Sequence, residues 1–432
     1  MAAQLYKTES GRLFHAGAIA LITVGLPARG KTHVSRSLCR FLRWLGVPTK
    51  VFHVGEYRRK LIHRSVSHDF FDPANEETAP ERLQAANQAL EDMVAYLLQG
   101  GQVGIYDGSN LTADRRQYIQ DRLEEDNIQT VFIESMCTDE RIVDENIRTV
   151  KVSSTDYQGW EIEKAVQDFK ARVKTATPYY QTIEDESQSY IKLINIDQQI
   201  ITNRIQGFLP SRLVFYLMNL HTAPRAIYLA RNAMSTDEQN YKADPSLTQE
   251  GQTHAKRLYD VLMARRQTRA SEGYLASTKP LKIWTSIRQS THATADYFPH
   301  EQIRQRKSLA ALHPGVYDGL TPEEIKTQHP EEYAARQKDP YRHRYPRGES
   351  YHDLAIRLEP VILELEHEKQ DVLIIAHESV LQCLYAYFCG YQPAEAIPSI
   401  QMPRNILLEI RPSAYGSKEE RIEILPNDST SS

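Results

Sequence analysis

Ala18-Ile-Ala-Leu-Ile-Thr-Val-Gly-Leu-Pro-Ala-Arg-Gly-Lys-Thr32 runs from an apolar, strand-like segment through a glycine turn into an amphipathic, helix-like segment that ends at Gly46. It contains the complete P-loop pattern Gly25-x-x-x-x-Gly30-Lys31-Thr32. Glycines allow backbone N–H groups to surround phosphate oxygens, and the N-terminus of the helix adds partial positive charge. Lys31 is expected to neutralise the β- and γ-phosphates, and the Thr32 hydroxyl to bind Mg²⁺. Because a strand and a helix flank the pattern, we interpret it as a nucleotide site rather than a chance match.

The composition excludes several classes of protein. At 432 residues the chain exceeds the usual size of one domain, so we expect two. It is 41% hydrophobic and 25% charged, and its net charge of −4 gives no electrostatic reason to expect nucleic acid or a membrane as a partner. The four cysteines have no short paired spacing, which favours free, buried thiols in a reducing compartment. No segment has the length of a signal-peptide core or a membrane span, so we expect a cytoplasmic protein.

Strand-like and helix-like segments alternate through the first half of the chain. This alternation predicts an α/β domain with a mainly parallel sheet covered by helices on both faces, and ligands then collect at the carboxyl ends of the strands. Asp107 ends the apolar segment 103–107, where a carboxylate can hold Mg²⁺ directly or through water. The alternative is that Asp107 caps the helix that follows. The segments in question are strand-like at 51–54, 103–107 and 130–134, and helix-like at 81–98 and 139–150.

Several cationic side chains follow such turns. Most of them could lie on a solvated surface, but an acceptor that carries its own phosphate needs guanidinium groups to hold it. A P-loop kinase for a phosphorylated small molecule would therefore use several of these residues, which are Arg58, Arg59, Arg82, Arg115, Lys151 and Arg172.

Four motifs carry a resemblance to a known family. They are Gly25-Leu-Pro-Ala-Arg-Gly-Lys-Thr32, Gly46-Val-Pro-Thr-Lys-Val-Phe52, Val54-Gly-Glu-Tyr-Arg-Arg59 and Lys151-Val-Ser-Ser-Thr-Asp-Tyr157. The chain resembles the bifunctional 6-phosphofructo-2-kinase/fructose-2,6-bisphosphatases from about Ile19 to about Tyr415. The resemblance implies a P-loop kinase domain over residues 1–223 and an α/β histidine-phosphatase domain, similar to phosphoglycerate mutase, over residues 224–432. It also implies a homodimer.

For the first domain, the resemblance implies ATP-dependent phosphorylation of fructose 6-phosphate at its 2-hydroxyl, which yields the glycolytic regulator fructose 2,6-bisphosphate. Gly25, Gly30, Lys31 and Thr32 then bind the triphosphate and Mg²⁺, with Asp107 as the acidic residue. The remaining matches place Lys151 and Asn146 at the nucleotide, and Arg58, Arg59, Arg82, Ser109 and Arg172 at the sugar phosphate.

The sugar site departs from the family pattern. A Cys-Tyr-Glu segment of the family is replaced by Thr175-Ala-Thr177, so that a tyrosine that contacts the sugar becomes Ala176, although Tyr179 and Tyr180 lie close in sequence. Loss of one hydrogen bond costs about 1 kcal/mol, which would weaken binding without abolishing the chemistry.

The second domain lacks most of the chemistry that its family implies. The Arg-His-Gly-Glu signature is Arg231-Asn232-Ala233-Met234 here, and an amide nitrogen has no available lone pair to attack phosphorus. A second phosphate-binding arginine falls on Ser290 and the general acid on Ala311. Three other substrate ligands become Pro322, Pro340 and Gln382, while Arg231, Arg336 and His377 survive. We expect a folded domain without phosphatase activity, in which His377 is more simply a hydrogen-bonded residue at a strand end. Such a domain could serve as a dock, stabilise the kinase, or bind an anion at Arg231 and His377.

Three hypotheses follow from these residues. The first is a kinase for fructose 6-phosphate without the reverse bisphosphatase activity. The second is a non-catalytic regulator that binds a nucleotide or a sugar phosphate. The third is a kinase for another sugar phosphate, allowed by the altered residues Ser109, Leu111 and Ala176.

Overall fold

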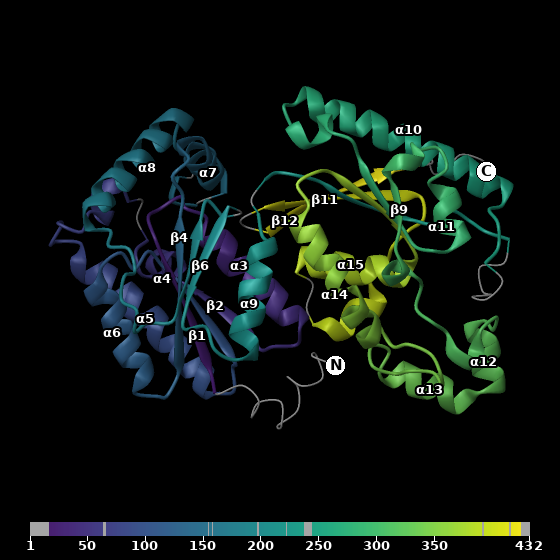
Figure 1. Ribbon diagram of the computed structural model, residues 1–432, viewed down its shortest axis with the longest axis horizontal. Helices are drawn as coiled ribbons and strands as arrows, with labels where there is room; N and C mark the ends of the chain where they lie inside the picture. The colour runs from purple at the N-terminus through teal and green to yellow at the C-terminus, as the bar shows by residue number, and fades with distance from the viewer. Residues whose placement is uncertain are drawn as a thin grey trace. The chain divides into compact units, whose positions relative to one another are not determined.

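Two six-stranded sheets organise the part of the chain that the computed structural model describes. That part comprises residues 17–63, 66–153, 155–157, 159–196, 198–221, 223–236, 244–390, 393–413 and 416–424. The chain divides into two compact units, Met1–Thr222 and Ala223–Ser432, one residue before the boundary expected from the sequence. Each unit contains one of the sheets (Figure 1).

The sheet of the first unit is parallel except at one edge. Its strand order is β2-β3-β1-β4-β5-β6, and only β6, paired with β5, runs antiparallel to its neighbour. β1 is buried along its whole length, as its uninterrupted apolar sequence requires of a central parallel strand. The bounds are β1 Ile19–Val24, β2 Thr49–His53, β3 Val103–Asp107, β4 Gln129–Met136, β5 Tyr190–Ile194 and β6 Gln199–Asn203.

Helices cover both faces of this sheet. α5 and α6 lie on one side of it, and α3 and α9 on the other (Figure 1). α5 packs Leu90 and Met93 against Ala20, Ile22 and Tyr106 of β1 and β3. The helices are α3 Lys31–Trp44, α4 Val54–Leu61, α5 Ala79–Leu98, α6 Ala113–Glu124, α7 Glu140–Ser153, α8 Ile162–Ala176 and α9 Phe208–Asn219, with a short 3₁₀ turn η1 at His68–Phe71. The expected α/β class of the first domain is confirmed.

The second unit repeats the same design. Its strand order is β12-β11-β7-β10-β8-β9, in which β7, β10, β8 and β9 are parallel and β11 pairs antiparallel with both β7 and β12. The strands are β7 Ile227–Arg231, β8 Lys282–Thr285, β9 Ile303–Gln305, β10 Val372–Ala376, β11 Ile406–Ser413 and β12 Gly416–Glu423. The helices are α10 Gln249–Ser271, α11 Gln289–Thr294, α12 Pro322–Gln328, α13 Pro330–Lys338, α14 Tyr351–His367 and α15 Glu378–Cys389.

The core of the second unit forms around its central strands. Tyr228 and Leu373, on β7 and β10, pack against Leu258 of α10. α14 starts with a capping box in which Ser350 and Asp353 bind each other's backbone N–H groups. This packing involves none of the residues expected to take part in chemistry, so the scaffold persists independently of them.

Two further expectations concern the whole chain. Cys39, Cys137 and Cys383 are buried free thiols, and Cys389 is a free, partly buried one. No helix among the described residues combines the length and the apolar character needed to cross a membrane.

Candidate functional site

The P-loop requires glycine at both Gly25 and Gly30 for steric reasons. Gly25 has φ 135°, and a Cβ there would lie 2.5 Å from the carbonyl oxygen of Ser135. Gly30 has φ 81°, and a Cβ there would lie 2.6 Å from Cδ1 of Ile196. Asn146 supports the loop from α7, because its Nδ2 donates to the carbonyl of Ala28 at 3.0 Å. The loop therefore has the close backbone approach and fixed shape of a phosphate site.

Lys31 is a buried cation at the start of α3. Its Nζ donates to the carbonyl of Leu26 at 2.7 Å within the loop itself. Burial lowers the pKa of Lys31 to about 7, Asp107 opposes this shift, and the charges of Arg172 and Arg29 add to it. An anion bound at the loop would restore the charged state of Lys31, so the site favours a ligand with several negative charges.

Asp107 is the last residue of β3 and is almost fully buried. Its carboxylate lies 2.8 Å from Nδ1 of His53 and accepts a hydrogen bond from the hydroxyl of Thr32. Burial favours its protonated form, but the hydrogen bond and charge of His53, and the charge of Lys31, lower the pKa of Asp107 below its usual value. Asp107 does not cap α6, since Thr112 does so by accepting from the N–H of Arg115. Asp107 therefore lies beside Lys31 and Thr32 of the P-loop and not at the start of α6.

The oxygen atoms of Thr32 and Asp107 fit a magnesium ion. Mg²⁺ prefers oxygen ligands, and it commonly takes one or two from protein and the rest from phosphate and water. The described residues contain no group of three or more His, Cys, Asp and Glu side chains that could hold a metal by themselves. A magnesium ion at this position would therefore depend on the phosphates that it accompanies.

Three of the expected substrate arginines converge beside the P-loop, and we call them the arginine cluster: Arg58, Arg59 and Arg172. Nη2 of Arg58 donates to both carboxylate oxygens of Asp156 at 2.6 Å, and Nη1 of Arg59 lies 3.7 Å from the same carboxylate. Arg172 forms no ion pair with any side chain that the structure describes. Asp156 therefore faces two guanidinium groups, and its charge and that of Asp168 also act on Arg172.

Phe71 orders the arginine cluster. Its ring centroid lies 3.4 Å from the guanidinium carbon of Arg172 and 5.0 Å from that of Arg58. The η1 turn that carries Phe71 is fixed to α8, because Nδ1 of His68 lies 2.8 Å from the carboxylate of Asp168. Burial lowers the pKa of Arg172, although Tyr157 opposes the shift. A phosphate monoester placed here would relieve this electrostatic cost.

The other expected ligands of the first unit have structural partners. Arg82 donates to the carbonyl of Phe70 at 2.8 Å and so fixes the segment between η1 and α5. Arg115 donates to Asn87 at 2.9 Å and joins α6 to α5. Ser109 follows β3, and its carbonyl accepts from the N–H of Gly25 at 2.9 Å. Lys151 lies in α7, but its side chain is outside the described part of the chain.

Neither of the two tyrosines close to Ala176 in sequence takes the place of the missing one. Ala176 is buried at the end of α8. The hydroxyl of Tyr180 donates to the buried carboxylate of Glu134 at 2.5 Å, while Tyr179 is exposed to solvent. Its proximity in sequence made Tyr180 a candidate to replace the missing tyrosine, but its hydroxyl is bonded to Glu134 instead.

In the second unit, two of the three surviving residues, Arg231 and His377, lie at the carboxyl ends of β7 and β10. Arg231 lies 3.3 Å from the carboxylate of Glu378 and donates to the carbonyl of Met402 at 3.1 Å. Nε2 of His377 lies 3.4 Å from the hydroxyl of Ser286. Burial, together with the charges of Arg288, Arg231 and Arg404, lowers the pKa of His377 to about 4. His377 is therefore a neutral imidazole near neutral pH.

The replaced positions of this unit are engaged with the protein itself. Nδ2 of Asn232 donates to the carbonyl of Ala233 at 3.2 Å. Ser290 is buried in α11, and the carbonyl of Ala311 accepts from Arg357 at 3.3 Å. Gln382 accepts from the hydroxyl of Tyr351 and donates to the carbonyl of Ile400, both at 2.7 Å. The guanidinium carbon of Arg336 lies 5.0 Å from the centroid of the Tyr345 ring.

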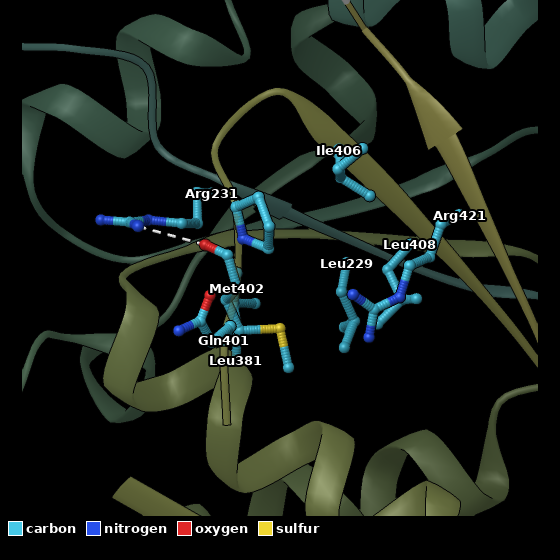
Figure 2. Close-up of a pocket in the computed structure, with 9 residues that line it drawn as sticks. Leu229, Arg231, Leu381, Gln401, Met402, Ile406, Leu408 and Arg421 are labelled. Atoms are coloured by element: carbon cyan, nitrogen blue, oxygen red, sulfur yellow. Dashed lines mark hydrogen bonds between the residues drawn. The ribbon is translucent and has the colours of Figure 1, made fainter. Parts of the chain in front are cut away.

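A small pocket opens beside Arg231. The space not filled by atoms amounts to about 280 Å³, part of which is open to solvent. Most of the lining is apolar. Figure 2 shows the hydrogen bond from Arg231 to the Met402 carbonyl, with Leu229, Ile406 and Leu408 on the opposite side of the pocket. The full lining is Leu229, Arg231, Leu381, Gln401, Met402, Pro403, Ile406, Leu408 and Arg421.

Sequence reasoning missed His53, Phe71 and Asp156. His53 ends β2 and is paired in register with Asp107 at the end of β3. Its place at the end of a predicted strand was a signal that could have identified it. Asp156 lies inside one of the four motifs that carried the resemblance. Phe71 carried no signal, because its role depends on a turn that is fixed by contacts distant in sequence.

Two family models match the chain, each over one part of it. A family model described as 6-phosphofructo-2-kinase matches residues 6–224, and one described as histidine phosphatase superfamily (branch 1) matches residues 227–422. The chain is 41% identical over 413 residues to 6-phosphofructo-2-kinase/fructose-2,6-bisphosphatase 3 of Homo sapiens, which covers 93% of this chain and 76% of the relative.

Two further relatives carry the same name without the final number. The protein of Gallus gallus is 40% identical over 412 residues, covering 93% of this chain and 84% of the relative. That of Arabidopsis thaliana is 41% identical over 414 residues, covering 94% of this chain and 54% of the relative. These matches extend over both units and confirm the resemblance drawn from the motifs. The chain belongs to the 6-phosphofructo-2-kinase/fructose-2,6-bisphosphatase family.

Proposed function

We propose that the chain transfers the γ-phosphoryl group of ATP to the 2-hydroxyl of fructose 6-phosphate and releases fructose 2,6-bisphosphate. One observation carries the proposal: the arginine cluster adjoins the P-loop, since the charge of Arg172 acts on Lys31 at the start of α3. Two phosphorylated substrates, a triphosphate and a sugar phosphate, would then find cationic partners in one continuous site.

The residues would divide the work of phosphoryl transfer as follows. The P-loop N–H groups and Lys31 bind the β- and γ-phosphates, and Arg58, Arg59 and Arg172 hold the 6-phosphate so that the 2-hydroxyl faces the γ-phosphorus. Thr32 and Asp107 would hold Mg²⁺, which neutralises charge on the phosphates when bound. Catalysis of this kind consists mainly of positioning and electrostatic stabilisation, which fits a site built of fixed cations. The nucleotide roles of Lys151 and Asn146, and the sugar roles of Arg82, Arg115 and Ser109, remain part of the proposal.

We further propose that the second unit does not hydrolyse fructose 2,6-bisphosphate. Phosphoryl transfer to a histidine needs a nucleophilic imidazole, guanidinium groups on the phosphoryl oxygens and an acid for the leaving alcohol. Asn232, Ser290 and Ala311 supply none of the three. His377 cannot supply all three groups by itself. Even if its neutral imidazole acted as the nucleophile, no acid would be present to protonate the departing alcohol.

A second candidate function is a non-catalytic regulator. Ala176 and the committed hydroxyl of Tyr180 favour it, because the sugar has lost a hydrogen-bonding partner that no neighbouring tyrosine replaces. The same altered pocket would also suit a kinase for a different sugar phosphate.

The test is an assay of the purified full chain with Mg·ATP and fructose 6-phosphate that detects acid-labile fructose 2,6-bisphosphate, with Lys31→Ala as the control. Product that disappears in the control supports the kinase. ATP binding without product, measured by calorimetry, would favour the regulator, and a panel of other sugar phosphates would identify a different acceptor. Incubation with fructose 2,6-bisphosphate should release no phosphate, and release would contradict the second proposal.

The family resemblance also supports a homodimer that works in the cytosol. Light scattering of the purified chain, coupled to size-exclusion chromatography, tests the oligomeric state, and a monomer at assay concentrations would contradict it.

A further inference from the structure

We infer that His53 is a positioning residue, which fixes the Asp107 carboxylate for phosphoryl transfer at the P-loop and connects it to the turn that carries Arg58 and Arg59. This inference rests on the proposed function, since it assigns a further role within the same site. In this assignment His53 acts through Asp107 and not on a substrate directly.

The contact between the two side chains is set by the backbone. His53 and Asp107 are paired residues at the carboxyl ends of β2 and β3, and Nδ1 of His53 lies 2.8 Å from Oδ2 of Asp107. His53 is also the residue that precedes the first turn of α4, so both a strand and a helix hold its backbone. Side chains carried on such elements keep a more constant position than side chains on loops.

The opposite edge of the imidazole faces the α4 turn. A Cβ at Gly55 would lie 3.1 Å from Nε2 of His53 and 3.5 Å from Nη1 of Arg59. The absence of a side chain at Gly55 therefore leaves room for both groups at this point. The ring lies between Asp107 on one side and the arginine-bearing turn on the other, so it spans the two halves of the proposed site.

Asp107 needs a partner of this kind because it is buried. The hydroxyl of Thr23 lies 3.4 Å from Oδ1, and the Thr32 hydroxyl donates to the same carboxylate. His53 is the partner on Oδ2, and its removal would leave that oxygen free to rotate away from the geometry that the transferred group requires. Partners that orient a ligand in this way typically change metal affinity or activity about 10–100-fold when they are removed.

The test compares His53→Leu with His53→Asn in the full chain. The Nδ2 of asparagine can occupy nearly the position of Nδ1 and offers an N–H to the Asp107 carboxylate, whereas leucine fills the space and offers none. Three quantities are measured: kcat, the KM for fructose 6-phosphate, and the factor by which Mg²⁺ raises the affinity for ATP in calorimetry. His63→Leu is the matched control, because His63 is an exposed histidine of the same unit.

We expect His53→Leu to lower kcat and the Mg²⁺-dependent gain in ATP affinity by about 10-fold or more, with the KM for fructose 6-phosphate changed by less than about 3-fold. His53→Asn should recover both quantities to within about 3-fold of the parent. Equal losses in the two variants would overturn the inference, as would parent-like behaviour of His53→Leu or a loss in His63→Leu. A parent chain without kinase turnover would contradict the proposed function, and the Mg²⁺-dependent binding of ATP would still decide the role of His53.

Discussion

The two units build sheets of the same kind, yet they treat the side chains at the carboxyl ends of their strands differently. In the first unit, burial and neighbouring charges shift the pKa of both Lys31 and Asp107. In the second unit, Arg231 is neutralised by Glu378 and Asn232 is bonded to the adjacent carbonyl. The residues that pack the second sheet are not the residues that phosphoryl transfer to a histidine would need, so packing can hold this fold whether or not the unit is active.

The largest effect is expected at Lys31. Replacing Lys31 with alanine removes the cation that faces the β- and γ-phosphates, and the formation of fructose 2,6-bisphosphate should fall by about 10³-fold or more. Single-turnover assays with saturating fructose 6-phosphate measure this. The unfolding transition of the second unit should not change, because Lys31 belongs to the first unit. A variant that retained a tenth of the activity would show that the P-loop of this chain does not carry the reaction.

A smaller effect is expected at the arginine cluster. Replacing Arg172 with methionine keeps the aliphatic contact with Phe71 but removes the charge. Hydrogen bonds to charged groups contribute about 1.5–3 kcal/mol, so the KM for fructose 6-phosphate should rise about 10–100-fold. The affinity for ATP should change much less. Arg141→Met is the control, since the side chain of Arg141 is 92% exposed. A larger loss of ATP affinity than of sugar-phosphate affinity would place Arg172 at the nucleotide instead.

The sequence predicted those parts of the first site whose chemistry is local. The glycines, Lys31 and Thr32 are close together in the chain, and the buried segment before Asp107 placed its carboxylate at a strand end. The contact between His53 and Asp107 required the order of strands, which non-adjacent segments decide. Spacing could not distinguish Arg172, which faces the site, from Arg115, which joins two helices.

In the second unit, the sequence predicted which chemical groups are missing but not which contacts their replacements make. The motif positions of Asn232, Ser290 and Ala311 were enough to predict the missing groups. The sequence could not predict that Gln382 forms hydrogen bonds with both Tyr351 and the Ile400 carbonyl. These partners are brought to Gln382 only by the folded chain. The contacts of a residue such as Gln382 depend on the tertiary structure, which spacing in the sequence does not give.

A moderate effect of pH is expected in the second unit. The pKa of His377 is about 4 in the folded chain and 6.5 ordinarily, so between these values the unfolded chain binds a proton that the folded chain does not. Stability contributed by neutral His377 is complete above pH 6.5 and decreases as the pH falls towards 4. Between pH 7 and pH 5, the free energy of unfolding measured in urea should fall by about 1–2 kcal/mol less in His377→Gln than in the parent. His367→Gln, at an exposed histidine of the same unit, should behave like the parent. Equal losses in all three proteins would contradict a buried neutral imidazole.

The smallest effect is expected from an attempted repair of the second unit. Asn232→His restores an imidazole at the position of the nucleophile, but Ser290 and Ala311 still leave the phosphoryl oxygens and the leaving alcohol without partners. Catalytic groups that act as a unit give little when only one of them is present. Phosphate release from fructose 2,6-bisphosphate should therefore remain at the background level of the parent. The triple variant with Ser290→Arg and Ala311→Glu is the informative comparison, because measurable release there, and not in the single variant, would locate the loss in these three positions. Release by the single variant would instead mean that Arg231 and His377 still provide a working phosphate site.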